Sequence, residues 1–394
     1  MHNVQEFGFV LSHSYSHTMK SKSDPLYTVI GLMSGTSLDG VDAAMIRTDG
    51  EGQVERMGFL TIPYEDGVRE NIRKCLGRKE DVDGFVVRTA LELTRAHATA
   101  VDWLMSRMDK HPPDIDLIGF HGQTIFHDPA NKFTWQIGNG STLARLTGID
   151  VVCDFRSADV ATGGQGAPFL PLYHRALAQS AKLEGPIAIL NIGGVSNVTY
   201  IDGDAILAFD TGPGNALLDD WVKKKLNRDY DENGLIARQG KIHQEMVDKW
   251  LAHPYFAKKP PKSLDRDAWN VDAIAKLSAP DGAATLAAFT VQSVVKALDH
   301  LPIKPKRWLV TGGGRLNPVM MDGLKQVLGV SVGPVDDLGW SGDAMEAEGF
   351  AYLAVRSLRG LPLSLPTTTG VPKPMTGGRL YRHVDQAAAL SGRD

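Results

Sequence analysis

Three glycine-rich turns, each preceded by a short apolar run, carry the clearest chemistry in this sequence. The first spans residues 31–42 and mixes glycines with hydroxyl and carboxylate side chains, and the others contain Gly193-Gly194 and Gly312-Gly313-Gly314. Glycines let a backbone approach a polyphosphate, and hydroxyls and amides donate to its oxygens. The first turn matches neither G-x-x-x-x-G-K-[ST] nor G-x-G-x-x-G. The first two turns together, rather than either one alone, therefore predict phosphate binding, and the triple glycine of the third suits a flat ring lying against the backbone.

Two kinds of acidic residue accompany these turns. Asp39 and Asp42 in the first turn could order a hydrated divalent cation. Asp210 follows the apolar run 207–209 and precedes Thr211-Gly212-Pro213-Gly214, which predicts a carboxylate at a strand end facing a cleft. There it could act as a general base, and amides at the start of the next helix could face an anion. The alternative is an Asp that caps the turn through its own backbone, the commoner role beside Gly.

The elements that must position these residues alternate between short β-like runs and longer helical patterns, which is typical of α/β proteins. Strands are predicted at 27–31, 43–47, 57–62, 117–120 and 133–137, with a further β-like run at 151–155 and strands again from 187. Helices are predicted at 82–108, 216–225, 284–298 and 344–358. We therefore expect two similar halves meeting at a hinge cleft, with an ordered tail from residue 362.

Composition and charge narrow the class of protein. With 394 residues and a net charge of −4, the chain is long enough for two domains and has no basic stripe for a nucleic-acid partner. It contains no apolar run of the ~18 residues that a membrane span needs, so we expect a cytoplasmic protein without a membrane partner. Cys75 and Cys153 provide no disulfide framework. Residues 1–26, rich in Ser and His, are expected to be a mobile extension rather than a metal-binding tract.

The order and spacing of the three turns resemble those of a known superfamily. They are similar to the first phosphate loop, second phosphate loop and adenosine loop of the superfamily that unites sugar kinases, heat-shock chaperone ATPases and actin. The resemblance implies an α/β fold of two ribonuclease H-like domains with the active site in the cleft between them. The expected division is 27–153 plus 345–394 for domain I and 154–344 for domain II.

Eight motifs in order resemble one family in particular, the anhydro-N-acetylmuramic acid kinases, over about residues 27–380. The motifs are Gly31-Leu32-Met33-Ser34-Gly35-Thr36-Ser37-Leu38-Asp39-Gly40, His121-Gly122-Gln123-Thr124, Gln136-Ile137-Gly138-Asn139, Asp154-Phe155-Arg156, Gly163-Gly164-Gln165-Gly166-Ala167-Pro168, Asn191-Ile192-Gly193-Gly194, Phe209-Asp210-Thr211-Gly212-Pro213-Gly214-Asn215 and Gly312-Gly313-Gly314. The resemblance implies an enzyme that opens the 1,6-anhydro ring of its sugar with water at C1 while O6 receives the γ-phosphate of ATP. It assigns Asp210 as the base that activates the water, and it suggests a homodimer.

The same resemblance assigns the remaining site residues. Nucleotide contacts are expected from Gly35, Thr36, Ser37, Asp39, Gly40, Asp42, Gly193, Gly194, Gly312, Gly313 and Gly314. Substrate contacts are expected from Arg156, Gln165 and Glu346, with Arg156 suited to a lactyl carboxylate because a guanidinium offers a planar fork. Its alternative role is an ion pair, and that of Glu346 is to complement a helix dipole.

The sequence leaves open how a metal ion is held and which substrate, if any, the chain phosphorylates. Many sugar kinases carry an Asp in the first phosphate strand, whereas this chain has Leu32 and Met33 there, so Mg²⁺ is expected on ATP oxygens and water, with Asp39 or Asp42 reached through water. A kinase for levoglucosan or a plain hexose would leave Arg156 without a carboxylate to bind. A nucleotide-gated regulatory protein on the same fold would need no base at Asp210.

Overall fold

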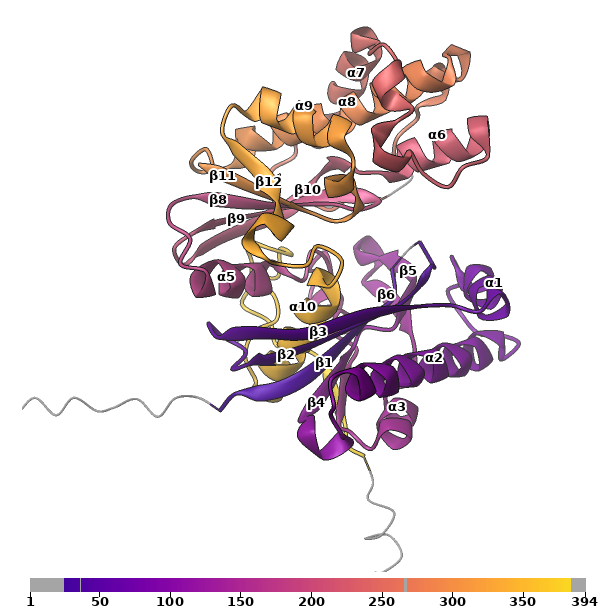
Figure 1. Ribbon diagram of the computed structural model, residues 1–394, viewed down its shortest axis with the longest axis vertical. Coiled ribbons are helices and arrows are strands. Elements are labelled where there is room, and N and C mark those ends of the chain that lie inside the picture. The colour runs from indigo at the N-terminus through magenta and orange to yellow at the C-terminus, as the bar shows by residue number, and fades with distance from the viewer. Residues whose placement is uncertain (1–24, 36, 266–267, 384–394) are drawn as a thin grey trace, which may run out of the picture.

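The computed structural model describes residues 25–35, 37–265 and 268–383, which form two large β-sheets with helices against their faces and a separate two-stranded hairpin (Figure 1). Most of the expected extension over residues 1–26 and the predicted phosphate contact Thr36 lie outside the described residues. None of the described helices has the length and apolar character that crossing a membrane requires.

The first sheet has six strands in the order β13-β7-β4-β1-β2-β3. Its strands are β1 (Tyr27–Met33), β2 (Gly40–Thr48), β3 (Val54–Pro63), β4 (Leu117–Phe120), β7 (Val151–Cys153) and β13 (Arg379–Tyr381). β1, β2 and β3 are antiparallel neighbours, whereas β4 and β7 continue the sheet parallel to β1. The accompanying elements are α1 (Asp66–Cys75), α2 (Phe85–Arg107), α3 (Gly140–Thr147), α4 (Ser157–Ala161) and the hairpin of β5 (Gln123–Asp128) and β6 (Phe133–Ile137).

The second sheet repeats this pattern in the order β10-β9-β8-β11-β12. Its strands are β8 (Ile187–Ile192), β9 (Val195–Asp202), β10 (Ala205–Pro213), β11 (Arg307–Thr311) and β12 (Ser331–Pro334). Again three antiparallel strands are followed by two parallel ones. Its outer helices are α6 (Ala216–Leu226), α7 (Gln244–Leu251), α8 (Ala279–Ala297) and α9 (Pro318–Leu328). The predicted α/β class and the similarity of the two halves are confirmed; the domain boundaries remain a prediction.

Two helices lie between the sheets, α5 (Pro171–Ser180) and α10 (Met345–Leu358) (Figure 1). One core cluster of the described residues includes Ile46 of the first sheet, Ile201 of the second, and Tyr173 and Tyr352 of these two helices. α10 lies so close to β1 that a Cβ on Gly31 would be 1.8 Å from the carbonyl oxygen of Ala347. A shared core of buried side chains therefore joins the two halves.

Local sequence explains most helix ends. α9 begins at Pro318 because Asn317 accepts hydrogen bonds from the first amides, and it ends at the left-handed Gly329. α8 begins at Ala279, five residues before the predicted start, because Ser278 caps the helix and Pro280 lies in its first turn. The other three predicted helices match α2, α6 and α10 to within a few residues.

Strand β10 lies at an edge of the second sheet, and two loops cover it. The amide of Ala208 donates to the carbonyl of Thr367 at 3.0 Å, and the amide of Asp210 donates to the carbonyl of Lys262 at 3.1 Å. The tail predicted from residue 362 thus reaches the strand that carries the candidate base.

Candidate active site

A cavity of about 310 Å³ lies where the two halves face each other. It is lined by residues of both, including Asp42 of β2, Gly193 after β8 and Gly312 after β11. The predicted site residues among its lining are Asp42, Arg156, Gly193, Gly312, Gly313 and Glu346. Residues that are distant in the sequence and were assigned to nucleotide and sugar therefore share one space.

A row of polar residues crosses four strands of the second sheet at one edge of this cavity. Asp210 of β10 is the register partner of Asn197, Asn197 pairs with Asn191, and Asn191 pairs with Thr311. Register partners place their side chains on one face of a sheet, and the last three residues line the cavity. Asp210, which is itself not among the described lining residues, therefore stands at the end of a polar row that leads into it.

Asp210 is almost enclosed, with 7% of its surface exposed. The amide of Leu264 donates to its Oδ2 at 2.8 Å, and the hydroxyl of Tyr255 donates to its main-chain carbonyl at 2.5 Å. Burial raises the pKa of Asp210 to about 7, opposed by the Leu264 hydrogen bond and by the charge of Lys262. A carboxyl group that titrates near neutrality suits a general base.

The strand-end prediction for Asp210 was locally wrong. β10 continues through Pro213, because a bulge between Asp210 and Gly212 lets the chain keep its pairing with β9. The amides just before α6 are not available to an anion. Those of Gly214 and Asn215 donate to the carbonyls of Gly194 and Gly193 at 3.0 and 2.7 Å, so the predicted phosphate turn packs against the start of α6, and an anion at the helix's own amides stays a prediction.

Arg156 is held by fixed partners at the wall of the cavity. Its Nε donates to Nε2 of His121 at 3.0 Å, and its Nη1 donates to the carbonyl of Gly166 at 2.6 Å. Because Arg can only donate, His121 must accept with Nε2 and donate from Nδ1 to the Gly122 carbonyl, 2.9 Å away. Burial lowers the pKa of Arg156 to about 10, opposed by Glu346 and Asp159. A carboxylate could still approach the edge formed by Nη1 and Nη2, since each carries a further N–H.

Of the other two predicted substrate residues, one lines the cavity and the other does not. Glu346, in the first turn of α10, lines the cavity, and burial raises the pKa of its carboxyl group against the opposing charge of Arg156. The Oε1 atom of Gln165 accepts from Ser263 Oγ at 2.7 Å. Among the described residues Gln165 does not line the cavity; its contact is instead with the segment next to Asp210.

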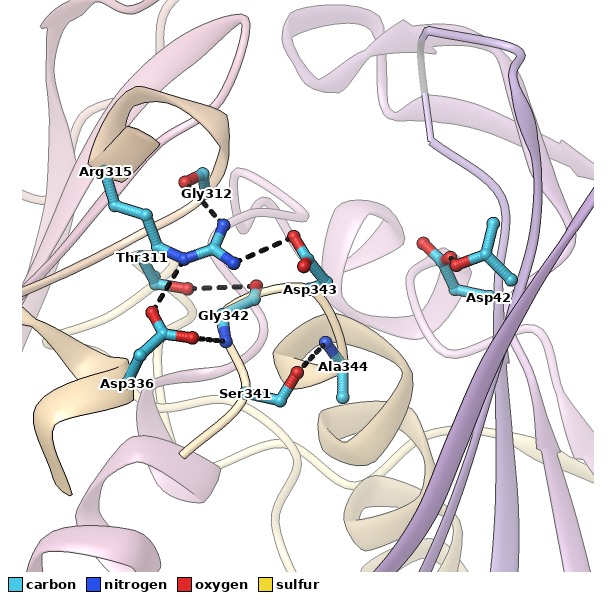
Figure 2. A network of polar contacts seen from close by, with 10 residues as sticks. Asp42, Thr311, Gly312, Arg315, Asp336, Ser341, Gly342, Asp343 and Ala344 are labelled. Atoms are coloured by element: carbon cyan, nitrogen blue, oxygen red, sulfur yellow. Dashed lines mark hydrogen bonds and ion pairs between the residues drawn. The ribbon is translucent and has the colours of Figure 1, made fainter. Parts of the chain in front are cut away.

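The triple-glycine turn is fixed by Arg315, as Figure 2 shows. The Arg315 guanidinium donates to the carbonyl of Gly312 at 3.1 Å and to Oδ2 of Asp336 at 2.8 Å, and its Nη2 lies 3.0 Å from Oδ1 of Asp343. Gly312 has φ +75°, and a Cβ there would be 2.3 Å from Oδ1 of Asn191. Glycine is thus required where the turn crosses the end of β8.

Asp42 and Asp343 face each other from opposite halves (Figure 2). Thr61 donates to Oδ1 of Asp42 at 2.6 Å. Burial raises the pKa of Asp42 to about 6, opposed by the Thr61 hydrogen bond and assisted by the charges of Asp39, Glu346 and Asp343. A bound cation would relieve this like-charge repulsion. Within the described residues, however, no group of three or more His, Cys, Asp or Glu side chains is arranged to hold a metal ion.

The rest of the first turn lies beside Asp42. Ser37 and Asp39 are exposed, and Ser37 Oγ donates to Oδ1 of Asp39 at 2.9 Å. Gly35 is half-buried and accepts a main-chain hydrogen bond from Leu38. Gly40 is buried at the start of β2, where a Cβ would be 2.2 Å from the Ile62 carbonyl oxygen, so packing against β3 by itself explains this glycine.

Sequence reasoning missed four residues that shape the cavity: Asn191, Asn197, Arg315 and Asp343. Arg315 directly follows the triple glycine, Asp343 lies three residues before Glu346, and Asn191 and Asn197 flank the Gly193-Gly194 turn. Their polar side chains next to strand ends were the available signal. Arg315 needed knowledge of Asp336 and Asp343, which only the fold brings to it.

Comparison with known proteins places the chain in a family. The profile of the anhydro-N-acetylmuramic acid kinases matches residues 27–383. A protein of Rhodospirillum rubrum named anhydro-N-acetylmuramic acid kinase is 50% identical over 363 residues, covering 91% of this chain and 96% of its own. One of the same name from Rhodopseudomonas palustris is 50% identical over 367 residues, covering 91% of this chain and 100% of its own. The chain belongs to the anhydro-N-acetylmuramic acid kinase family.

Proposed function

We propose that this chain is an ATP-dependent kinase that hydrolytically opens the 1,6-anhydro ring of 1,6-anhydro-N-acetylmuramic acid and phosphorylates O6. The products are N-acetylmuramic acid 6-phosphate and ADP, as required for peptidoglycan recycling. The observation that carries the proposal is that one cavity between the halves brings Arg156 and Glu346 together with the Gly193 and Gly312 turns. The names of the relatives support the same activity.

In the proposed reaction Asp210 acts on water. The water transfers a proton to the Asp210 carboxylate as its oxygen bonds to C1, and the C1–O6 bond breaks. O6 keeps that electron pair and bonds to the γ-phosphorus as the bond from phosphorus to ADP breaks. An anhydrosugar has no free 6-hydroxyl to deprotonate, so the base is needed at the anomeric carbon. With its pKa raised to about 7, Asp210 can accept a proton and release it again near neutral pH.

The proposed sugar contacts come from Arg156, Glu346 and Gln165. The lactyl carboxylate would meet Arg156, whose orientation is fixed by His121 and Gly166. Glu346 lies beside Arg156 in the same cavity and can accept from a sugar N–H or hydroxyl. Gln165 would act through Ser263. Levoglucosan lacks a carboxylate, so Arg156 favours the anhydromuramate.

ATP would lie with its phosphates between the first two turns and its adenosine at Gly312-Gly313-Gly314. Gly35, Thr36, Ser37, Asp39, Gly40 and Asp42 would surround the phosphates opposite Gly193 and Gly194. The carboxylates fit a Mg²⁺ ion held mainly by ATP oxygens and water, with Asp42 and Asp39 bonded to its water ligands. When bound, the ion would neutralise charge on the transferring phosphoryl group. We also propose a cytoplasmic homodimer.

The test is ADP release from ATP and Mg²⁺ in ¹⁸O-labelled water with 1,6-anhydro-N-acetylmuramate, N-acetylmuramate or levoglucosan. We expect turnover of the anhydromuramate with label at C1, and loss of turnover in Asp210→Asn. The matched control is Asp204→Asn, an exposed carboxylate in the turn before β10, which should keep wild-type turnover. Preference for the open sugar, unlabelled C1 or an active Asp210→Asn variant would contradict the mechanism.

A further inference from the structure

Lys262 is a buried cation directly behind the candidate base. Only 2% of its surface is exposed. Its Nζ atom lies 3.1 and 3.4 Å from the carbonyl oxygens of Tyr255 and Phe256 and 3.2 Å from Nε2 of His300. The ammonium also faces the rings of Phe209 and Tyr255, at 5.5 and 4.6 Å. Burying a charge is costly unless it is compensated, so a lysine at this position calls for a functional reason.

The segment that begins with Lys262 is attached to Asp210 by two hydrogen bonds, through Lys262 and Leu264. The carbonyl of Lys262 accepts from the Asp210 amide at 3.1 Å, and two residues later the Leu264 amide donates to Oδ2 of Asp210 at 2.8 Å. Between them Ser263 donates to Gln165. Tyr255 contacts both Lys262 and Asp210, since its carbonyl accepts from Lys262 Nζ and its hydroxyl donates to the Asp210 carbonyl.

We propose that Lys262 is a positioning residue for Asp210: its ammonium holds segment 262–264 against β10, and its charge keeps the Asp210 carboxylate ionised and ready to accept a proton. The inference rests on the proposed role of Asp210 as base. Lys262 does not touch the substrate in this proposal. It acts through the Leu264 hydrogen bond and through the electrostatic field at the carboxylate.

The electrostatics of the pair agree with this arrangement. Burial raises the pKa of Asp210 and the charge of Lys262 lowers it. In turn, burial lowers the pKa of Lys262 to about 8, assisted by the charge of Lys258 and opposed by that of Asp210. Within the described part of the chain, the titratable groups that face the pair are Tyr255, His300 and Lys258. At neutral pH Lys262 is therefore still mainly charged while Asp210 titrates.

The experiment compares the pH dependence of kcat/KM for Lys262→Met, Lys262→Arg and wild type between about pH 5 and pH 9. Without the charge, we expect the acidic limb of Lys262→Met to move up by about one pH unit, so that activity below the limb falls about tenfold and recovers in alkali. Lys262→Arg keeps the charge and should restore the wild-type limb. The control Lys258→Met removes an exposed neighbouring charge and should leave the limb where it is.

Two results would overturn the proposal. One is an unmoved limb in Lys262→Met, and the other is an equal loss of activity at every pH, which a purely structural role would give. If Lys262→Met does not fold, Lys262→Gln removes the charge and keeps N–H donors on a side chain one atom shorter. If the wild type does not turn over the anhydrosugar, the proposed function fails, and infrared titration of the Asp210 carboxyl group decides about Lys262. Its midpoint should rise in Lys262→Gln, and an unchanged midpoint would refute the inference.

Discussion

The buried carboxyl group of Asp210 should reduce the stability of the folded protein, and the cost should depend on pH. Burial raises its pKa to about 7 in the folded chain, against about 3.9 for an ordinary Asp. The folded state therefore holds the Asp210 proton more tightly than the unfolded state, so this group makes the free energy of unfolding fall as pH rises from about 4 to about 7. At about 1.4 kcal/mol per pH unit, the full cost is about 4 kcal/mol, of which about 2 kcal/mol develops between pH 5 and pH 7.

Asp210→Asn removes the titration and keeps the shape. We expect the variant's advantage over wild type in free energy of unfolding to grow by about 2 kcal/mol from pH 5 to pH 7. Lys262 stays charged over this range because its pKa is about 8. Urea unfolding followed by tryptophan fluorescence suits the measurement, since Trp221, Trp250, Trp269 and Trp308 all pack in the core cluster of the second half.

The matched control is Asp204→Asn, which makes the same atomic change at an exposed position on the same hairpin. Its difference from wild type should not change in the same way between the two pH values. An Asp210→Asn advantage that is constant with pH, or one that shrinks as pH rises, would refute the assignment of Asp210 as a buried group that titrates near neutrality.

Three further predictions concern the binding of the sugar and of ATP, the turn at Gly312, and closure of the cleft. Arg156→Lys loses the Nε contact with His121, so it should raise KM for the anhydromuramate about tenfold with little effect on KM for ATP. Arg315→Lys should instead raise KM for ATP with little effect on KM for the anhydromuramate. Steady-state kinetics with each substrate varied would measure both constants, and equal effects on the two would contradict the assignment. Gly312→Ala should destabilise the protein by about 2 kcal/mol or more in thermal unfolding, because its Cβ meets Asn191; Gly329→Ala, also at positive φ but in open space, is the control and should cost less. An ATP analogue with the sugar should close the cleft and reduce the radius of gyration in small-angle scattering, and an unchanged radius at saturation would count against closure.

The fold was predictable where its signals are local. An apolar run followed by glycines indicates a strand entering a turn, and β1, β8 and β11 each obey this pattern. Ser278 and Asn317 fix the starts of α8 and α9 locally, although the predicted start of α8 was five residues too late. Local signals fail at β10, where Gly212 and Pro213 suggest a break, yet pairing with β9 carries the strand through a bulge. There, tertiary pairing overrides the preference of the two residues.

The site was predictable only as far as single residues carry chemistry. Asp210 and Arg156 stand out by type and neighbourhood. The polar row of Asp210, Asn197, Asn191 and Thr311 depends instead on strand register, and no spacing within one segment reveals it. In the sequence, Lys262 cannot be told from an ordinary surface lysine. It is buried because Tyr255, Phe256 and His300 pack around its ammonium group in the fold.

The coverage of β10 by loops has a consequence for truncated chains. An open strand edge offers unpaired amides and carbonyls to other molecules and promotes aggregation. Here the carbonyls of Thr367 and Lys262 occupy the amides of Ala208 and Asp210. A chain that lacks the segment after residue 362 would leave the amide of Ala208 unpaired, while the carbonyl of Lys262 would still occupy that of Asp210. The exposed part of β10 could then pair with another chain, two residues away from the carboxylate of the proposed chemistry.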